Sequence, residues 1–430
     1  MEAKEYRGLW WLPSNKERKV AGVLTYIPSE EFKLELIGTF DAEYDGTFLA
    51  GLKSNLVEPV IHGQSSDGSD ITLFECVSSF SHTGCAEFST SIYKARAIAV
   101  GLHLESIDEK RFFRSSVRIP ELSYWFYPAI IKHEYDDQHG RGIMVKIDNL
   151  SDDEREVARV DLSKDLSVCL CRDASFESGN MYFNPSFEQF TSLKIESREN
   201  LSLKEYYEIV ARYEQFLSLA TFREVGYSEL RLFSKDNYYE HVEGETYYEP
   251  IIVDTKFHTK PSAKKIERHK FIFDYKSIEE QYPRALQKWF SNDWKFDAIR
   301  THFLDSIDYH GHFSYINFLV VIQAVEGYGQ RFIKKTKRRS LQEILTDIFR
   351  ALDGVVCVNQ GVDLGAIVAT RHYHSHLLAK RSDKALDGIN LYELTDELRK
   401  VLICCILSYI GFTKDQINDI TKHTNNDLFG

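Results

Sequence analysis

The amino-acid sequence predicts an α+β protein, in which a β-rich N-terminal domain is followed by a C-terminal all-α helical bundle. Runs of β-branched and aromatic residues, separated by turn residues, fill the first part of the chain. Apolar residues at helical spacing dominate the last part. A chain of 430 residues is also too long for one ordinary hydrophobic core. We expect a β-rich domain at 1–195, a mixed connecting region with a long helix at 196–276 and the helical domain at 277–430.

Five segments of the N-terminal part have the composition of strands. In residues 33–40, apolar side chains fall on both faces, which is typical of a sandwich or of a covered sheet. Turn residues such as Asp45-Gly46 and His139-Gly140 separate the runs. The expected strands are 22–27, 33–40, 71–79, 91–104 and 111–119.

The connecting region contains the first clear helix, which begins near residue 203. Ser202 and Glu205 have the spacing of a capping box, in which each side chain binds a free backbone N–H at the helix start. Apolar residues then recur every three or four positions, so the helix has one apolar face. Strand-like segments follow at 228–234 and 250–255, and the basic segment 256–270 is expected to be a linker or loop.

The last part of the chain is expected to be wholly helical. Gly411 follows a long apolar run at a position typical of a helix end. Thr413 and Gln416 form a second capping-box pattern directly after it. The expected helices are 280–290, 294–309, 313–333, 340–352, 360–380, 390–410 and 414–423.

Composition excludes several classes of protein. A hydrophobic content of 43% and a charged content of 27% fit a soluble globular protein. The sequence has neither an apolar run of membrane-spanning length nor the features of a signal peptide, so we expect a cytoplasmic protein without a membrane partner. The seven cysteines are odd in number and form no CxxC pair, which argues against a disulfide framework and a zinc knuckle.

Charge is unevenly distributed along the chain. The net charge of −12 opposes general nucleic-acid binding, because phosphate contacts require Lys and Arg. Residues 281–430, however, contain 19 Lys and Arg against 17 Asp and Glu, a balance of +2, which leaves −14 for the rest. The segment RFIKKTKRRS is therefore expected to dock RNA, the alternative being a solvated connection between helices. The candidate RNA-binding residues are Lys334, Lys335, Lys337, Arg338 and Arg339.

The stretch RHYHSH places Arg371, His372, His374 and His376 within six residues, between two apolar flanks. Three interpretations are open. His372 and His376 have the i, i+4 spacing of two zinc ligands, but a Tyr stands at position 373 and no third ligand is evident. The histidines could instead lie partly exposed on a helix surface. The interpretation that we favour is acid/base chemistry on a phosphodiester, which requires no metal and no cofactor.

This chemistry suits an Arg and a His. Histidine titrates near neutral pH, and Arg presents a fixed set of donors to a phosphate. RNA contains its own nucleophile, the 2′-hydroxyl, so these two groups are a minimal catalytic set. Arg371 and His376 are five residues apart, or about 140° around an ideal helix. Two copies of the motif that meet across a dimer axis would bring both residue types to one phosphate.

The motif and its surroundings resemble the HEPN superfamily. The stretch NFLVVIQAVEGYGQRF is similar to the family's long second helix, with Glu326 at its acidic position. The stretch ALDGINLYELTDELRKVLICCILSYIGF is similar to its closing helix. The beginning, RGLWWLPSNKERKVAGVLTYIPSEEFKLELIGTF, resembles the start of an ApeA N-terminal domain. The chain thus resembles an ApeA-like HEPN protein over nearly its whole length.

The resemblance implies roles for particular residues. Arg371 and His376 match the motif residues and are the expected catalytic pair, and His372, at the polar position after the Arg, is the third expected catalytic residue. Glu326 is a supporting residue that would orient the motif, and His374 has no assignable role. The family implies metal-free cleavage of RNA, with tRNA as a candidate substrate, to a 2′,3′-cyclic phosphate within a homodimer or higher homo-oligomer of HEPN domains.

The expected function is that of a bacterial anti-phage endoribonuclease that causes abortive infection. In this interpretation the N-terminal domain responds to a phage trigger protein. The alternative is a non-catalytic binding module, in which the HEPN helices dimerise while the N-terminal domain recognises a phage component. A third alternative is modification by nucleotidyl transfer or AMP addition from a partner protein.

Overall fold

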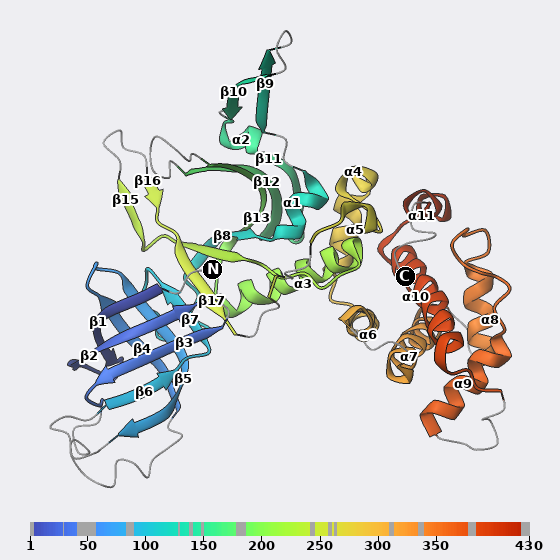
Figure 1. Ribbon diagram of the computed structural model, residues 1–430, viewed down its shortest axis with the longest axis horizontal. Coiled ribbons are helices and arrows are strands. Elements are labelled where there is room, and N and C mark those ends of the chain that lie inside the picture. The colour runs from blue at the N-terminus through green and yellow to red at the C-terminus, as the bar shows by residue number, and fades with distance from the viewer. Residues whose placement is uncertain are drawn as a thin grey trace.

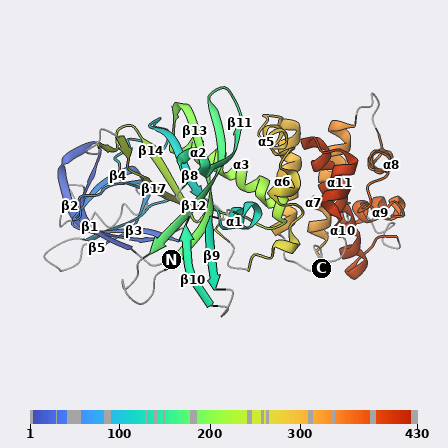
Figure 2. The same ribbon diagram turned by 90° about the horizontal axis from the view of Figure 1, so that it is seen from above.

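The computed structural model describes residues 4–422 apart from thirteen internal gaps, and the large sheet and the C-terminal helices occupy opposite ends of the molecule (Figures 1 and 2). The α+β class predicted from the sequence is confirmed. The gaps are residues 29, 41–56, 83–89, 128–129, 137–140, 148–149, 178–185, 241–245, 257–259, 262–264, 309–313, 334–338 and 377–383.

The first six strands form a closed antiparallel barrel. They pair in the order β5-β4-β1-β2-β3-β6, and β6 pairs back with β5. Trp10 is fully buried in the barrel core and packs where Gly63 has no side chain, since a Cβ there would lie 2.3 Å from the Trp10 ring. The strands are β1 (Lys4–Leu12), β2 (Asn15–Ile27), β3 (Glu31–Ile37), β4 (Val57–Ser65), β5 (Asp70–His82) and β6 (Thr90–Lys94).

The remaining strands of the 13-stranded sheet extend from the barrel through β5, which pairs with β7 at its beginning and with β6 at its end. From there the order is β7-β17-β14-β8-β13-β12-β11. Figure 1 shows β11, β12 and β13 as a curved layer. These strands are β7 (Ala97–Val100), β8 (Phe112–Arg118), β11 (Glu156–Asp161), β12 (Leu166–Glu177), β13 (Ser186–Leu201), β14 (Glu229–Ser234) and β17 (Ile251–Thr255).

One sequence expectation about the strands differs from the structure. The single strand expected at 91–104 is two strands, because the chain leaves the barrel at Ala95 and Arg96, whose N–H groups donate to Phe32 and Phe74 on different strands. The region 196–276 begins within β13 and contributes β14 and β17 to the middle of the sheet. Local patterns could not show this pairing, because the partners of β14 and β17 lie far away in the sequence.

Helix α3 (Leu203–Thr221) joins the sheet to the C-terminal helices (Figure 1). Its predicted capping box is present: the Glu205 N–H donates to Ser202 Oγ at 3.2 Å, and the Ser202 N–H donates to Glu205 Oε2 at 2.8 Å. One hydrophobic core runs from the curved sheet across α3 into the helices. The smaller elements of this half are α1 (Pro120–Phe126), α2 (Asp152–Arg155), β9 (Ile131–Asp136), β10 (Arg141–Ile147), β15 (Tyr238–Glu240), β16 (Thr246–Tyr248) and the 3-10 helix η3 (Arg268–Lys270).

Each of the seven helices expected after residue 277 is present, and α4 is additional. Helix α7 is central, because α6, α8, α9 and α10 all pack against it. Gly411 ends α10 in a left-handed conformation, and the Thr413–Gln416 capping box begins α11. The helices are α4 (Tyr275–Ile278), α5 (Tyr282–Trp289), α6 (Trp294–Asp308), α7 (Tyr315–Phe332), α8 (Leu341–Ala351), α9 (Leu364–His376), α10 (Gly388–Ile410) and α11 (Lys414–Thr421).

Across the described ranges, no helix has both the length and the apolar composition needed to cross a membrane.

Candidate active site

The RHYHSH stretch forms the last turns of α9. The carboxylate of Asp363 accepts the N–H groups of Gly365 and Ala366 at the start of this helix, at 2.8 and 3.2 Å. Ile367 is buried in the core. Thr370 is also buried, and its Oγ1 accepts the N–H of Leu386 at 3.0 Å, which ties α9 to the segment before α10. The helix is therefore anchored up to the residue that precedes Arg371.

Arg371 is held by Glu326 on α7. Its Nη2 donates to Glu326 Oε2 at 3.4 Å, and both side chains are partly buried. The second carboxylate oxygen, Oε1, accepts from Gln330 Nε2 at 3.0 Å, one turn further along α7. Glu326 is thus oriented on its own helix and in turn orients Arg371. A guanidinium has five N–H donors, and the hydrogen bond to Glu326 uses one of them. Arg371 therefore retains donors for a phosphate.

His376 lies at the exposed end of α9, away from the surroundings of Arg371. Its ring stacks on that of His372, with centroids 6.1 Å apart. Arg371 lines a cavity whose described lining does not include His376. The structure therefore brings together the two histidines and, separately, Arg371 with Glu326. Within one chain it does not join the motif Arg and His, which agrees with their angular offset on the helix.

His374 has a packing role. Its ring lies parallel to that of Tyr315, at a centroid distance of 5.4 Å and an interplanar angle of 3°. Its Nε2 is 3.3 Å from the carbonyl oxygen of Leu386. These contacts attach α9 to the beginning of α7 and to the segment before α10.

The cavity beside Arg371 has a volume of about 280 Å³ and lies between α6, α7 and α9. Its polar lining consists of His302, Gln323, Glu326, Gln330, Arg331 and Arg371. Sequence reasoning missed His302, which lies in α6 and far from the motif in the chain. The residues next to His302 in the sequence form no recognisable motif. Only the packing of α6 on α7 brings His302 to the cavity.

The basic segment is only partly described. Lys334, Lys335, Lys337 and Arg338, expected to bind RNA, lie outside the described residues. Arg339 is described, and its guanidinium is directed inward. Its Nη1 donates to Asp347 Oδ2 at 3.1 Å, and its Nη2 donates to the carbonyl oxygens of Gly329 and Ile333 at 2.7 and 3.1 Å. Arg339 therefore joins α7 to α8, and its side chain is buried together with that of Asp347.

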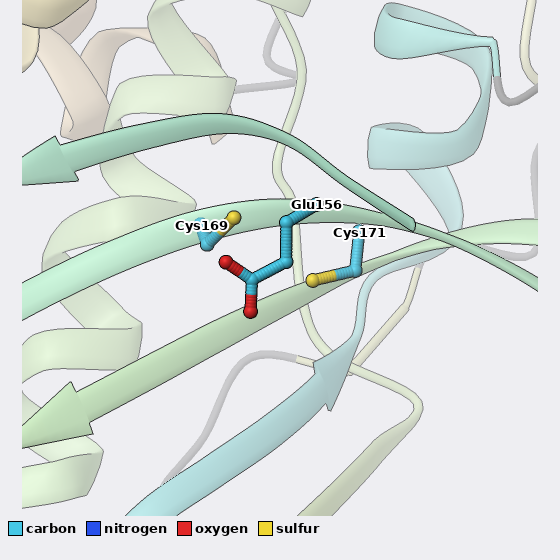
Figure 3. A group of neighbouring side chains, drawn as sticks. All are labelled: Glu156, Cys169 and Cys171. Carbon is cyan, nitrogen blue, oxygen red and sulfur yellow. The ribbon is translucent and has the colours of Figure 1, made fainter. Parts of the chain in front are cut away.

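In the described part of the chain, one group of at least three side chains is close enough to share a metal ion, and it lies away from α9. Glu156 on β11 and Cys169 and Cys171 on β12 point toward one another, with donor atoms within 4.8 Å (Figure 3). Glu156 is already paired with Lys194, at 2.6 Å, and with Arg159, at 3.6 Å. Since these cations neutralise the carboxylate and would repel a metal ion, we interpret Glu156 as part of an ion-pair network.

The fold and the site together define a class of protein: a β-barrel-containing N-terminal domain joined to a helical domain that carries an Arg-x4-His motif. Residues 5–289 match the family model of the ApeA N-terminal domain 1, and residues 319–416 match that of the Apea-like HEPN domain. Since the first match covers more than half of the chain, the protein belongs to the ApeA N-terminal domain 1 family, and its C-terminal helices form an Apea-like HEPN domain.

The limits of the two matches can be placed on the helices. The first match ends with the last residue of α5. The second match includes Glu326, Arg371 and His376 and begins after α6. HEPN domains are a family of ribonucleases that often occur in defence systems. A search of curated proteins and a search of solved structures each found no match.

Proposed function

We propose that this protein is a metal-independent endoribonuclease that acts in anti-phage defence and causes abortive infection. The observation that carries the proposal is the arrangement on α9. Arg371 is held by Glu326 at a polar cavity, and His376 is exposed five residues later on the same helix. The Apea-like HEPN match to this region supports it.

The chemistry follows from the two side chains. Arg371 binds the scissile phosphate and stabilises the negative charge that develops on it. The 2′-hydroxyl of the RNA attacks phosphorus, and His376 transfers a proton during the displacement. The products are a 2′,3′-cyclic phosphate and a 5′-hydroxyl. His372, stacked on His376, holds the His376 ring in position.

The complete site is formed by two copies of the HEPN domain. In one chain, Arg371 lines a cavity and His376 lies outside its described lining. A two-fold axis near the end of α9 places the Arg371 of one copy beside the His376 of the other. We therefore propose a homodimer, or a higher homo-oligomer built from such dimers, as the active state. The proposed substrate is tRNA, and the N-terminal domain is the part that responds to a phage trigger protein.

The test is an RNA cleavage assay with purified protein, mixed cellular RNA and EDTA. We expect wild type to produce fragments with 2′,3′-cyclic phosphate ends, and His376→Ala to cleave at least about 10²-fold more slowly. His269→Ala changes an exposed histidine in the part of the chain that matches the ApeA N-terminal domain 1, and it is the matched control, with an expected rate equal to wild type. End-mapping of cellular RNA after induced expression identifies the substrate.

Equal cleavage by wild type and His376→Ala would refute the proposed role of the motif. Intact RNA under all conditions, together with tight binding of a phage protein, would instead favour the non-catalytic binding module.

A further inference from the structure

His302 on α6 lies outside both the Arg-x4-His motif and the part of the chain that matches the HEPN family. We propose that His302 is a second proton-transferring residue, which accepts the proton of the RNA 2′-hydroxyl while the phosphate is bound by Arg371. The inference rests on the proposed ribonuclease function. It assigns the cavity between α6, α7 and α9 as the place where the scissile phosphate and its ribose bind.

The hydrogen bond of His302 determines which ring nitrogen can accept a proton. Its Nδ1 lies 2.8 Å from the backbone carbonyl oxygen of Ala298, one helical turn earlier. A carbonyl oxygen can only accept, so Nδ1 carries the hydrogen of this bond. In the neutral ring Nε2 then has the lone pair, and a ring held in this way on a regular helix is oriented in advance. His302 is half-buried and lines the cavity, as a general base at this place requires.

The charges around the cavity suit a phosphodiester. Among its described lining residues, Arg331 and Arg371 are positive and Glu326 is the single carboxylate. Arg331 Nη1 donates to the carbonyl oxygen of Lys295 at 2.7 Å, which holds this guanidinium against α6 and leaves most of its donors unused by that bond. A volume of about 280 Å³ lies just below the range for drug-sized ligand sites. It is suited to one phosphate and its sugar, not to a duplex.

The proposed reaction conserves atoms, charge and protons. The 2′-hydroxyl oxygen attacks phosphorus, and its proton passes to Nε2 of His302. The bond between phosphorus and the 5′ oxygen breaks, and the 5′ oxygen takes a proton from the protonated His376 of a second copy of the chain. RNA is the only substrate, and no metal or redox partner takes part. His302 then loses its proton to water and His376 regains one.

The pH dependence of cleavage distinguishes this role from a structural one. The charged groups that face His302 in the cavity are Glu326 and Arg331 from α7 and Arg371 from α9. A base that must be neutral and an acid that must be protonated give a bell-shaped profile, with the low-pH side due to the base. Removing the base should abolish the low-pH side and leave the high-pH side, which belongs to His376.

The experiment measures cleavage of a tRNA mixture in EDTA between about pH 5 and 9. The variants are His302→Ala and His302→Gln, with His269→Ala as control, and thermal denaturation verifies that each is folded. We expect both His302 variants to lose roughly 10²-fold in maximal rate and to lose the low-pH side of the profile. His302→Gln keeps a polar side chain in the cavity, so the same loss in both variants assigns the effect to proton transfer.

Three outcomes oppose the inference, and they can be told apart. If wild type cleaves no RNA at any pH, the proposed function fails and this inference fails with it. If wild type cleaves and His376→Ala does not, but the His302 variants match wild type, only this inference is refuted. If the His302 variants are slow but keep the bell-shaped profile, His302 positions groups without transferring the proton, which also refutes it.

Discussion

At the scale of single residues, Glu326 is the group that positions Arg371. Its two carboxylate oxygens are divided between Gln330 on the same helix and Arg371 on α9. The spacing of a motif can identify Arg371 and His376, because both lie in one short stretch. It cannot identify His302, whose relation to Arg371 exists only after α6 and α9 have packed on α7.

We predict that Glu326→Ala lowers kcat for RNA cleavage by roughly 10- to 100-fold, because small displacements of a phosphate-binding group are costly. Glu326→Gln retains an acceptor for Arg371 and should recover part of the rate. Steady-state kinetics measures the effect, which should appear mainly in kcat. Glu267→Gln, which removes an ion pair with Lys270 in the part of the chain that matches the ApeA N-terminal domain 1, is the control. If the Glu326→Ala enzyme has the kcat of wild type, Glu326 is not needed to position Arg371.

At the scale of elements, the helix starts and ends follow from local sequence. The capping boxes at Ser202 and Thr413 and the helix end at Gly411 are present as predicted. They could be predicted because each involves residues within one helical turn. The packing of α7 on α8 could not, since it depends on a close approach at Gly329 that no local pattern reveals. An ideal Cβ on Gly329 would lie 2.4 Å from Ile344 Cγ2 and 2.9 Å from Ile348 Cδ1.

Gly329→Ala should therefore lower the free energy of unfolding by about 1–3 kcal/mol, as expected for overpacking. The steric cost of the added methyl group should exceed the gain of about 1 kcal/mol by which Ala stabilises a helix interior relative to Gly. Urea denaturation of wild type and variant measures the net change in the free energy of unfolding. Gly327→Ala, two residues earlier on α7, is the matched control, because its nearest contact would be Ile299 Cγ1 at an ordinary 3.9 Å. Equal stability of the two variants would contradict the proposed close approach of α7 and α8.

At the scale of the whole molecule, the proposed active site requires two chains. Arg371→Ala and His376→Ala should each be inactive alone, yet mixing them should restore activity. In a mixed dimer, one of the two sites combines an intact Arg371 from one chain with an intact His376 from the other.

If subunits exchange randomly, the mixture should reach roughly a quarter of the wild-type rate, since half of the dimers are mixed and each has one intact site of two. Cleavage of tRNA before and after subunit exchange measures the recovery. A mixture of wild type with the double variant, at equal total protein, provides the reference for dilution. No recovery, in a mixture shown to contain mixed dimers, would place both catalytic groups of each site in one chain.

The sequence alone determined the class of the fold, the order of its two domains, most helix limits and the position of the Arg-x4-His motif. These features depend on periodicity and on contacts within a few residues, which can be read directly from the chain. Only the tertiary structure decided that β14 and β17 belong to the large sheet, that Arg339 is buried with Asp347, and that His302 shares a cavity with Arg371. Each of these depends on segments that come together only when apolar faces distant in sequence are buried against one another.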